Sequence, residues 1–429
     1  MVGGRKMKRN ERRKRIMPVI LAVAICITSM LVMEPAETSA ATTYIKPEEF
    51  IRALVKELDL PVDSSNVDAA IKAGIVKDGE EFSSNLTRTE AAVLLNRADE
   101  YLYGDTLDPK LLELTLEKRI SDIQSIEEDK RLDVVKCYLK GFIKGYSNGK
   151  YSTDRKFKGN SKMSYNGALK CIAMLKDKSL RAKISLDGQL IRTTNLPKNA
   201  ELFPYILASY PNKYYEWELK YQTIARLNKD KKITNLVDYA SPKNIDNLNV
   251  SDYEKFSLIK KECINEWMEK AKKHLELVFN VNYRTIDNEW YDSILKTNYQ
   301  YGTVYEWLPR KKLDWYIEMM KQNKTIVEAD KIAVDGSSLY YYNDSFYMRV
   351  YVKYRVISSE DLSVPDGNTP GDKWSYDKVL FSYGFNDLGK KITLGEWREE
   401  YYNIVLGDYS TEGDLGIQYV EFLPGKELD

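Results

Sequence analysis

Residues 141–151 read Gly-Phe-Ile-Lys-Gly-Tyr-Ser-Asn-Gly-Lys-Tyr, and a degenerate copy, Gly-Ile-Val-Lys-Asp-Gly-Glu-Glu-Phe, occupies residues 74–82. In each copy a glycine ends an apolar helical pattern, and a second glycine permits a tight turn before an aromatic residue. A polar loop and a second amphipathic pattern follow each copy. The sequence therefore predicts two helix–glycine loop–helix units, and an all-α fold for this part of the chain.

The helix expected after the first glycine loop has a strong start signal. Thr87 is the predicted N-cap, and Glu90, three residues later, completes a capping box. Arg88 lies at the first helical position, beside the positive end of the helix dipole.

The two units resemble the S-layer homology domain. Ile120-Ser-Asp-Ile123 is similar to the family's Phe-x-Asp-Val entry, and residues 141–151 are similar to its glycine-rich loop. Leu86-Thr-Arg-Thr-Glu90 resembles its Ile-Thr-Arg-Ala-Glu signature, and Ile45-Lys-Pro-Glu-Glu-Phe50 looks like part of an earlier repeat. The resemblance covers residues 44–178, with a partial and a first repeat in 44–105 and a second repeat in 119–178.

The resemblance implies a function. Such domains, usually three together in a pseudo-threefold bundle, bind secondary cell-wall polysaccharide that often carries a pyruvate ketal. An arginine at a helix N-terminus offers two parallel donors to the ketal carboxylate, and glycine loops let the backbone approach a sugar. The residues that the resemblance implies for binding are Arg88, Thr87, Glu90, Asp122, Lys144, Gly145 and Gly149.

Several of these residues also have a structural interpretation. Arg88 can be a surface residue paired with an acid, Lys144 a solvated loop lysine, and Asp122 an N-terminal cap. The position of Arg88 is taken by Pro47 in the partial unit and by Tyr165 or Asn166 in the second. At most one arginine-based site is therefore expected.

Residues 1–40 have the three-part layout of a secretory signal peptide. Eight basic side chains in residues 5–15 precede an apolar run from Ile16 to Met33, and small residues stand at 39–41. An uncleaved anchor is the alternative. We expect a secreted protein of the cell wall or cell surface, which meets a membrane only through this segment before cleavage.

Composition excludes several function classes. The 65 Lys and Arg balance 64 Asp and Glu, so no nucleic-acid partner is expected. A single His and the lack of a Cys-x-x-Cys pair argue against a metal site, and no cofactor is expected. Cys137, Cys171 and Cys263 are interpreted as buried free thiols, with a Cys137–Cys171 bridge left open.

The chain changes character after Leu180. All 7 Trp and 25 of the 32 Tyr follow this residue, which predicts a separate, aromatic-rich α+β domain with antiparallel strands in residues 195–429. Residues 179–194 are expected to form a connector with one short strand. Helices are predicted at 251–279 and 305–320, an extended packing segment at 202–219, and strands at 338–357 (a hairpin turning at Asn343-Asp344), 378–385 and 397–406.

This region has no recognisable catalytic motif, so an enzyme is the less favoured interpretation. His274 is expected to be structural or exposed. The acid pairs Asp287/Glu289 and Glu399/Glu400 could form a glycosidase dyad, although solvated faces are favoured. Strand residues Tyr347 and Tyr351 could form a sugar-stacking platform, although sheet packing is favoured.

The preferred hypothesis is an exported surface protein, anchored non-covalently to wall polysaccharide by the repeats and displaying the α+β domain. One alternative is a wall-glycan hydrolase that the repeats position. The other is a structural or partner-binding protein whose repeats no longer bind polymer.

Overall fold

The computed structural model describes residues 43–218, 252–342, 345–360, 393–407, 415–422 and 426–427. The expected signal segment, the strand predicted at 378–385 and the turn residues Asn343 and Asp344 lie outside these ranges. Residues Ile45–Asp429 belong to one compact unit. No helix among the described residues combines the length and the apolar character that crossing a bilayer requires.

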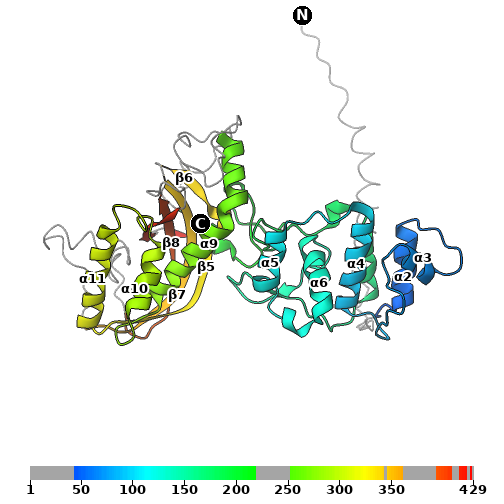
Figure 1. Cartoon of the computed structure of the whole chain (residues 1–429), viewed down its shortest axis with the longest axis horizontal. Helices are drawn as coiled ribbons and strands as arrows, with labels where there is room; N and C mark the ends of the chain where they lie inside the picture. Colours follow the sequence, from blue (N-terminus) through cyan, green and yellow to red (C-terminus); the bar gives the residue numbers. More distant parts are fainter. Residues whose placement is uncertain are drawn as a thin grey trace, which may run out of the picture. The chain divides into compact units, whose positions relative to one another are not determined.

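The first part of this unit is mainly helical (Figure 1). Its strands β1 and β2 form a two-residue antiparallel ladder. The predicted helices are present, and α5, which lies between the two predicted repeats, was not anticipated. The elements are α2 (Pro47–Glu57), α3 (Asn66–Lys72), α4 (Arg88–Tyr103), α5 (Pro109–Lys118), α6 (Glu128–Leu139), β1 (Tyr146–Ser147), β2 (Arg155–Lys156) and α7 (Tyr165–Ala173).

A closed ring of three backbone hydrogen bonds joins the starts of α2, α4 and α7. The N–H of Ile45 donates to Met163 (3.1 Å), that of Leu86 to Ile45 (2.9 Å), and that of Met163 to Leu86 (2.8 Å). Each of these residues stands immediately before the N-cap of its helix. The three helices therefore begin at a common three-way junction.

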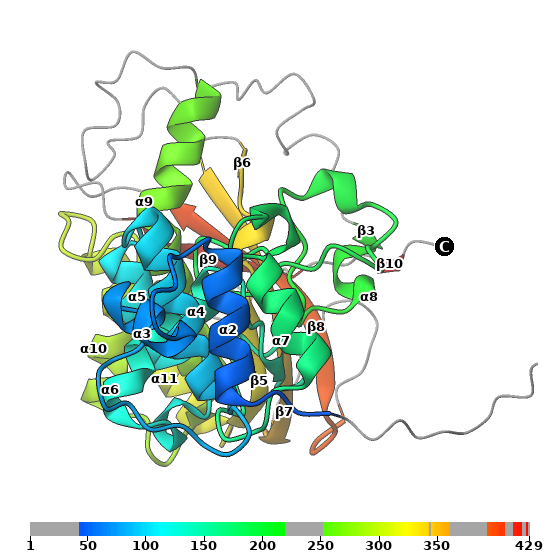
Figure 2. The same ribbon diagram turned by 90° about the vertical axis from the view of Figure 1, so that its right-hand side faces the viewer.

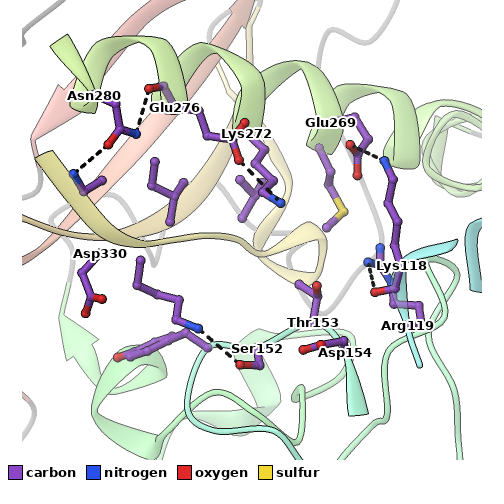
Figure 3. A pocket seen from close by; sticks show the side chains of 16 residues that line it. Lys118, Arg119, Ser152, Thr153, Asp154, Glu269, Lys272, Glu276, Asn280 and Asp330 are labelled. Carbon is purple, nitrogen blue, oxygen red and sulfur yellow. Dashed lines mark hydrogen bonds and ion pairs between the residues drawn. The ribbon is translucent and has the colours of Figure 1, made fainter. Parts of the chain in front are cut away.

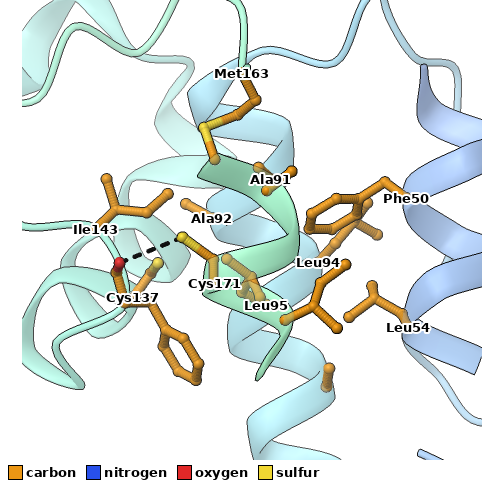
Figure 4. Packing of buried hydrophobic residues seen from close by; sticks show 14 of the residues in the cluster. Phe50, Leu54, Ala91, Ala92, Leu94, Leu95, Cys137, Ile143, Met163 and Cys171 are labelled. Atoms are coloured by element: carbon orange, nitrogen blue, oxygen red, sulfur yellow. Dashed lines mark hydrogen bonds between the residues drawn. The ribbon is translucent and has the colours of Figure 1, made fainter. Parts of the chain in front are cut away.

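Below this junction the helices share one apolar core, to which Phe50, Leu94 and Cys171 contribute from α2, α4 and α7 (Figure 4). Cys137, Cys171 and Cys263 are buried, and none of them forms a disulfide, so the preferred interpretation of the cysteines is confirmed. Burial raises the pKa of the Cys171 thiol to about 11, and the Cys171 Sγ donates to the Phe142 carbonyl at 3.5 Å.

The connector at 179–194 does not contain the predicted strand. It forms a buried polar turn in which the Asp187 carboxylate pairs with Arg119 (3.5 Å) and accepts from Ser185 and Gln189. Gly188, at φ +80°, reverses the chain and accepts from the Tyr138 hydroxyl at 3.0 Å. In place of a strand, isolated β-bridges pair Ile184 with Leu190 across this turn and Ile191 with Leu207.

The second part is α+β, as predicted. Helices α9, α10 and α11 accompany a six-stranded antiparallel sheet of order β4-β5-β7-β8-β9, with β6 paired to β7. Separately, β3 (Trp217–Glu218) pairs with β10 (Lys426–Glu427). The predicted helices, the hairpin and the strand at 397–406 are confirmed, whereas α10, β5 and β9 were missed. The elements are α9 (Asp252–Phe279), β4 (Val281–Asn282), α10 (Asn288–Thr297), α11 (Trp307–Gln322), β5 (Ile326–Val334), β6 (Tyr340–Tyr342), β7 (Ser345–Ser358), β8 (Arg398–Gly407) and β9 (Gly416–Phe422).

Both faces of the sheet are covered. Met348 and Val350 of β7 pack with residues of α9, α10 and α11, because alternate strand residues point to one face. On the other face, Tyr351 packs with Tyr210 and Tyr214. Both belong to the segment that precedes β3, and Figure 2 shows its one helical turn, α8 (Asn212–Tyr215), next to β3. The prediction of an extended segment is wrong over most of its length: turns and bends precede α8, and of the described residues only β3 at the end is a strand.

Candidate functional site

The N-terminal positions of α2, α4 and α7 decide where a cation can lie at the three-way junction. Their first helical residues are Pro47, Arg88 and Tyr165. The structure thus selects Tyr165, and not Asn166, as the counterpart of Arg88. Of the three helix starts, only that of α4 has a cation in this position.

The guanidinium of Arg88 is held by its surroundings. Its Nε donates to the Phe157 carbonyl at 2.9 Å, and its Cζ lies 4.9 Å from the ring centroid of Tyr146 and 5.2 Å from that of Phe157. Within the described residues, no carboxylate forms an ion pair with Arg88 and no group accepts from its Nη atoms. The interpretation of Arg88 as a cation paired with an acid is therefore wrong.

Two neighbours of Arg88 were not anticipated. The Tyr146 ring is 45% exposed, and the Lys158 Nζ lies 4.5 Å from its centroid. An exposed aromatic ring thus lies beside two cations. We call the group formed by Arg88, Tyr146, Phe157 and Lys158 the Arg88 surface. Arg88 and Lys158 are far apart in sequence, so the group is recognised only in the structure, where both cations contact the Tyr146 ring.

Thr87 and Glu90 form the predicted capping box. The Thr87 Oγ1 accepts from the Glu90 N–H at 3.2 Å, and the Glu90 carboxylate accepts from the Thr87 N–H at 2.7 Å. The same carboxylate accepts from the backbone and hydroxyl of Ser83. Burial raises the pKa of Glu90, but these hydrogen bonds outweigh it and the pKa is lowered. Both side chains hold the start of α4.

Asp122 holds the loop that carries Phe157. Its two carboxylate oxygens accept from the N–H groups of Phe157 (2.6 Å) and Lys158 (2.7 Å). It makes no side-chain cap hydrogen bond, so its interpretation as an N-terminal cap is wrong. Because Phe157 and Lys158 belong to the Arg88 surface, Asp122 positions that surface through their backbone N–H groups.

We expect Asp122→Ala to lower the free energy of unfolding by about 2 kcal/mol, because two charge-assisted hydrogen bonds are lost and Lys158 remains at φ +55°. Urea denaturation measures this change. Asp129→Ala, an exposed acid in the first turn of α6, is the control and should change it by less than about 0.5 kcal/mol. Equal effects of the two substitutions would show that Asp122 does not hold the loop.

The glycine loop is fixed by its backbone. The carbonyls of Lys144 and Gly145 accept from the Arg155 side chain at 2.6 and 3.2 Å. Gly145 has φ +63°, and a Cβ there would lie 3.0 Å from the Lys156 carbonyl oxygen. Gly149, at φ +110°, donates to the Ser147 hydroxyl at 3.2 Å. Lys144 is exposed, as its interpretation as a solvated loop lysine requires.

A polar cavity of about 510 Å³ lies elsewhere, between α9, β5 and the loop 151–154 (Figure 3). Lys118 pairs with Glu269 at 2.6 Å, and Lys272 pairs with Glu276 at 3.6 Å. Since these charges neutralise one another in pairs, the cavity favours neither anions nor cations.

The acid pairs do not form a dyad. Glu399 and Glu400 are consecutive residues of β8, so their side chains point to opposite faces. Glu400 pairs with Arg398 and accepts from the hydroxyl of Tyr402. Asp287 caps α10 through the Trp290 N–H at 3.0 Å, and Glu289 in the first turn of α10 is exposed.

His274 is structural. Burial lowers its pKa to about 3, and its Nδ1 lies 2.7 Å from the Thr297 hydroxyl, so the ring is neutral. The sugar-stacking platform is wrong for Tyr351, which is 3% exposed and stacks on Tyr151 at 3.7 Å. Tyr347 is half-buried.

The described residues contain no group of His, Cys, Asp and Glu side chains suited to a metal ion. In comparisons with known proteins, no family model, curated protein or solved structure matches this chain.

Proposed function

We propose that this chain is an exported cell-surface protein that binds acidic secondary cell-wall polysaccharide through the Arg88 surface. The observation that carries the proposal is the Arg88 guanidinium, fixed through Nε while its Nη donors have no partner among the described residues. The three-way junction of α2, α4 and α7 supports it, because a pseudo-threefold bundle is the arrangement that the S-layer homology resemblance implies.

The Arg88 surface suits a sugar that carries a carboxylate, such as a pyruvate ketal. The two Nη groups can donate in parallel to one carboxylate. The exposed Tyr146 ring offers an apolar face to the sugar, and Lys158 adds a second positive charge. Thr87, Glu90 and Asp122 take part by holding this surface in place, and the glycine loop of Gly145 places Tyr146.

The proposal is tested by calorimetric titration of residues 45–429 with purified wall polysaccharide. Arg88→Ala should weaken binding by roughly tenfold or more, because a charge-assisted pair of hydrogen bonds is lost. Arg52→Ala, an exposed arginine in the middle of α2, is the matched control and should bind like the unmodified protein.

The alternatives give different outcomes in the same experiment. No binding by the unmodified protein would favour a structural or partner-binding role for the repeats. Hydrolysis of the polymer during the titration would favour the hydrolase, whose candidate acids in β8 and α10 are engaged in an ion pair and a helix cap.

A further inference from the structure

The loop between α10 and α11 exposes an unusual amount of apolar surface. Val304 is 83% exposed, Trp307 61%, Tyr305 48% and Tyr301 43%. We call residues 301–307 the tip. Contiguous exposed apolar side chains in a folded protein mark a surface that contacts another phase or molecule.

The tip is preformed. The Gly302 N–H donates to the Glu306 carboxylate at 2.7 Å, and the Glu306 N–H donates to the Thr303 carbonyl at 3.1 Å. At the base of the loop, the Tyr299 N–H donates to Ile417 of β9 at 3.2 Å. Presenting the apolar side chains therefore requires little ordering on contact.

Positive charge accompanies the apolar side chains. Glu306 pairs with Arg310, and hydrogen bonding from Gly302 lowers the pKa of the Glu306 carboxyl, although burial opposes this. The other charged residues between 296 and 312 are lysines: Lys296, Lys311 and Lys312. The segment thus has a positive net charge, which complements an anionic surface.

The order of these residues along α11 matches a bilayer interface. Trp307 is the first residue of the helix, and exposed Arg310 and Lys311 follow three and four residues later on the same face. One helical turn separates the aromatic and basic levels by about 5 Å, comparable to the distance from the acyl boundary to the lipid phosphates. Trp and Tyr are the side chains that favour this boundary.

We propose that the tip inserts into the surface of an anionic lipid bilayer, with Val304 and Trp307 at the acyl boundary and Lys311 at the phosphates. This gives the protein a membrane contact besides the one expected of its first forty residues, and it does not depend on polysaccharide binding.

Co-sedimentation of residues 45–429 with vesicles tests the proposal; all the hydrophobic clusters of the structure lie within this part of the chain. The protein should bind vesicles of phosphatidylglycerol and phosphatidylcholine more strongly than pure phosphatidylcholine, and salt should weaken binding. The double variant Val304→Asp/Trp307→Ala should lose at least tenfold in binding, and Lys311→Glu should lose part of the preference for anionic lipid.

Tyr101→Ala, which removes a 52% exposed aromatic side chain of α4, should bind like the unmodified protein. Unchanged thermal unfolding of each variant shows that the effects are local. No binding to anionic vesicles, or equal binding by the double variant, overturns the proposal. Self-association that disappears in the double variant, without vesicle binding, also overturns it and assigns the tip to a contact between copies.

Discussion

Arg349→Ala is expected to lower the free energy of unfolding by about 3 to 5 kcal/mol, the largest effect we anticipate from a single substitution. The Arg349 side chain is 1% exposed, and its guanidinium donates to the Tyr214 carbonyl. Asp335 is also fully buried. Burial raises the pKa of its carboxyl to about 6, and the positive charge of Arg349 limits this rise. Removing the guanidinium leaves the buried Tyr214 carbonyl without this donor and the buried Asp335 carboxyl without this nearby positive charge.

Arg355→Ala is the matched control for this prediction. Arg355 lies on the same strand and pairs with Glu328 at 2.9 Å, but both side chains are solvated, so a change below about 1 kcal/mol is expected. Urea denaturation measures both variants. If Arg349→Ala lowered the free energy of unfolding no more than Arg355→Ala, the buried contacts of Arg349 would not stabilise the fold as we expect.

The effect of Arg349→Ala should also depend on pH. The pKa of Asp335 is raised in the folded state, so its contribution to stability falls as the pH rises through about 6. Without Arg349 this pKa rises further, and ionised Asp335 then costs more at pH 7 than at pH 5, where it is largely protonated. The loss of stability should therefore be larger at pH 7.

Gly141→Ala is expected to cost about 3 kcal/mol, against about 1 kcal/mol for Gly74→Ala. The two glycines end α6 and α3 with the same pair of hydrogen bonds. The glycine N–H donates to the carbonyl three residues before it, and the N–H of the following residue donates to the carbonyl five residues before its own position. Both have positive φ, +79° and +71°. They differ in space: a Cβ at Gly141 would lie 2.2 Å from the Ala182 carbonyl oxygen, whereas nothing lies within 4 Å at Gly74.

Thermal unfolding of the two alanine variants gives the comparison directly. Both variants lose stability because an alanine is placed at positive φ. The additional loss in Gly141→Ala measures the clash of its Cβ with Ala182. Equal losses would mean that the connector does not pack against the end of α6.

Local patterns made much of the helical part predictable. The capping box of Thr87 and Glu90 and the helix-ending glycines Gly74 and Gly141 follow from contacts within a few residues, so a single sequence contains them. The helix at 251–279 was predictable for the same reason, because buried residues such as Cys263, Trp267 and Ala271 recur at helical spacing.

The remaining features depend on contacts between distant residues. Tyr146 lies in β1 and Lys158 follows β2, and they join Arg88 only because this hairpin and the residues after it lie against the start of α4. Asp122 looked like a sugar ligand or a cap, whereas its acceptors are used by a backbone 35 residues away. Sheet packing is favoured for Tyr351 from the sequence, but its partners Tyr210 and Tyr214 come from the distant segment before β3. No local pattern encodes these pairings.

The central claim is that Arg88 binds a carboxylate of the wall polymer. The most direct measurement is a calorimetric cycle with the unmodified protein and Arg88→Ala, each titrated with polysaccharide before and after removal of its pyruvate ketals. We predict that ketal removal weakens binding to the unmodified protein by roughly tenfold and leaves the already weak binding of Arg88→Ala unchanged. An equal loss for both proteins, or none for the unmodified protein, would contradict the claim.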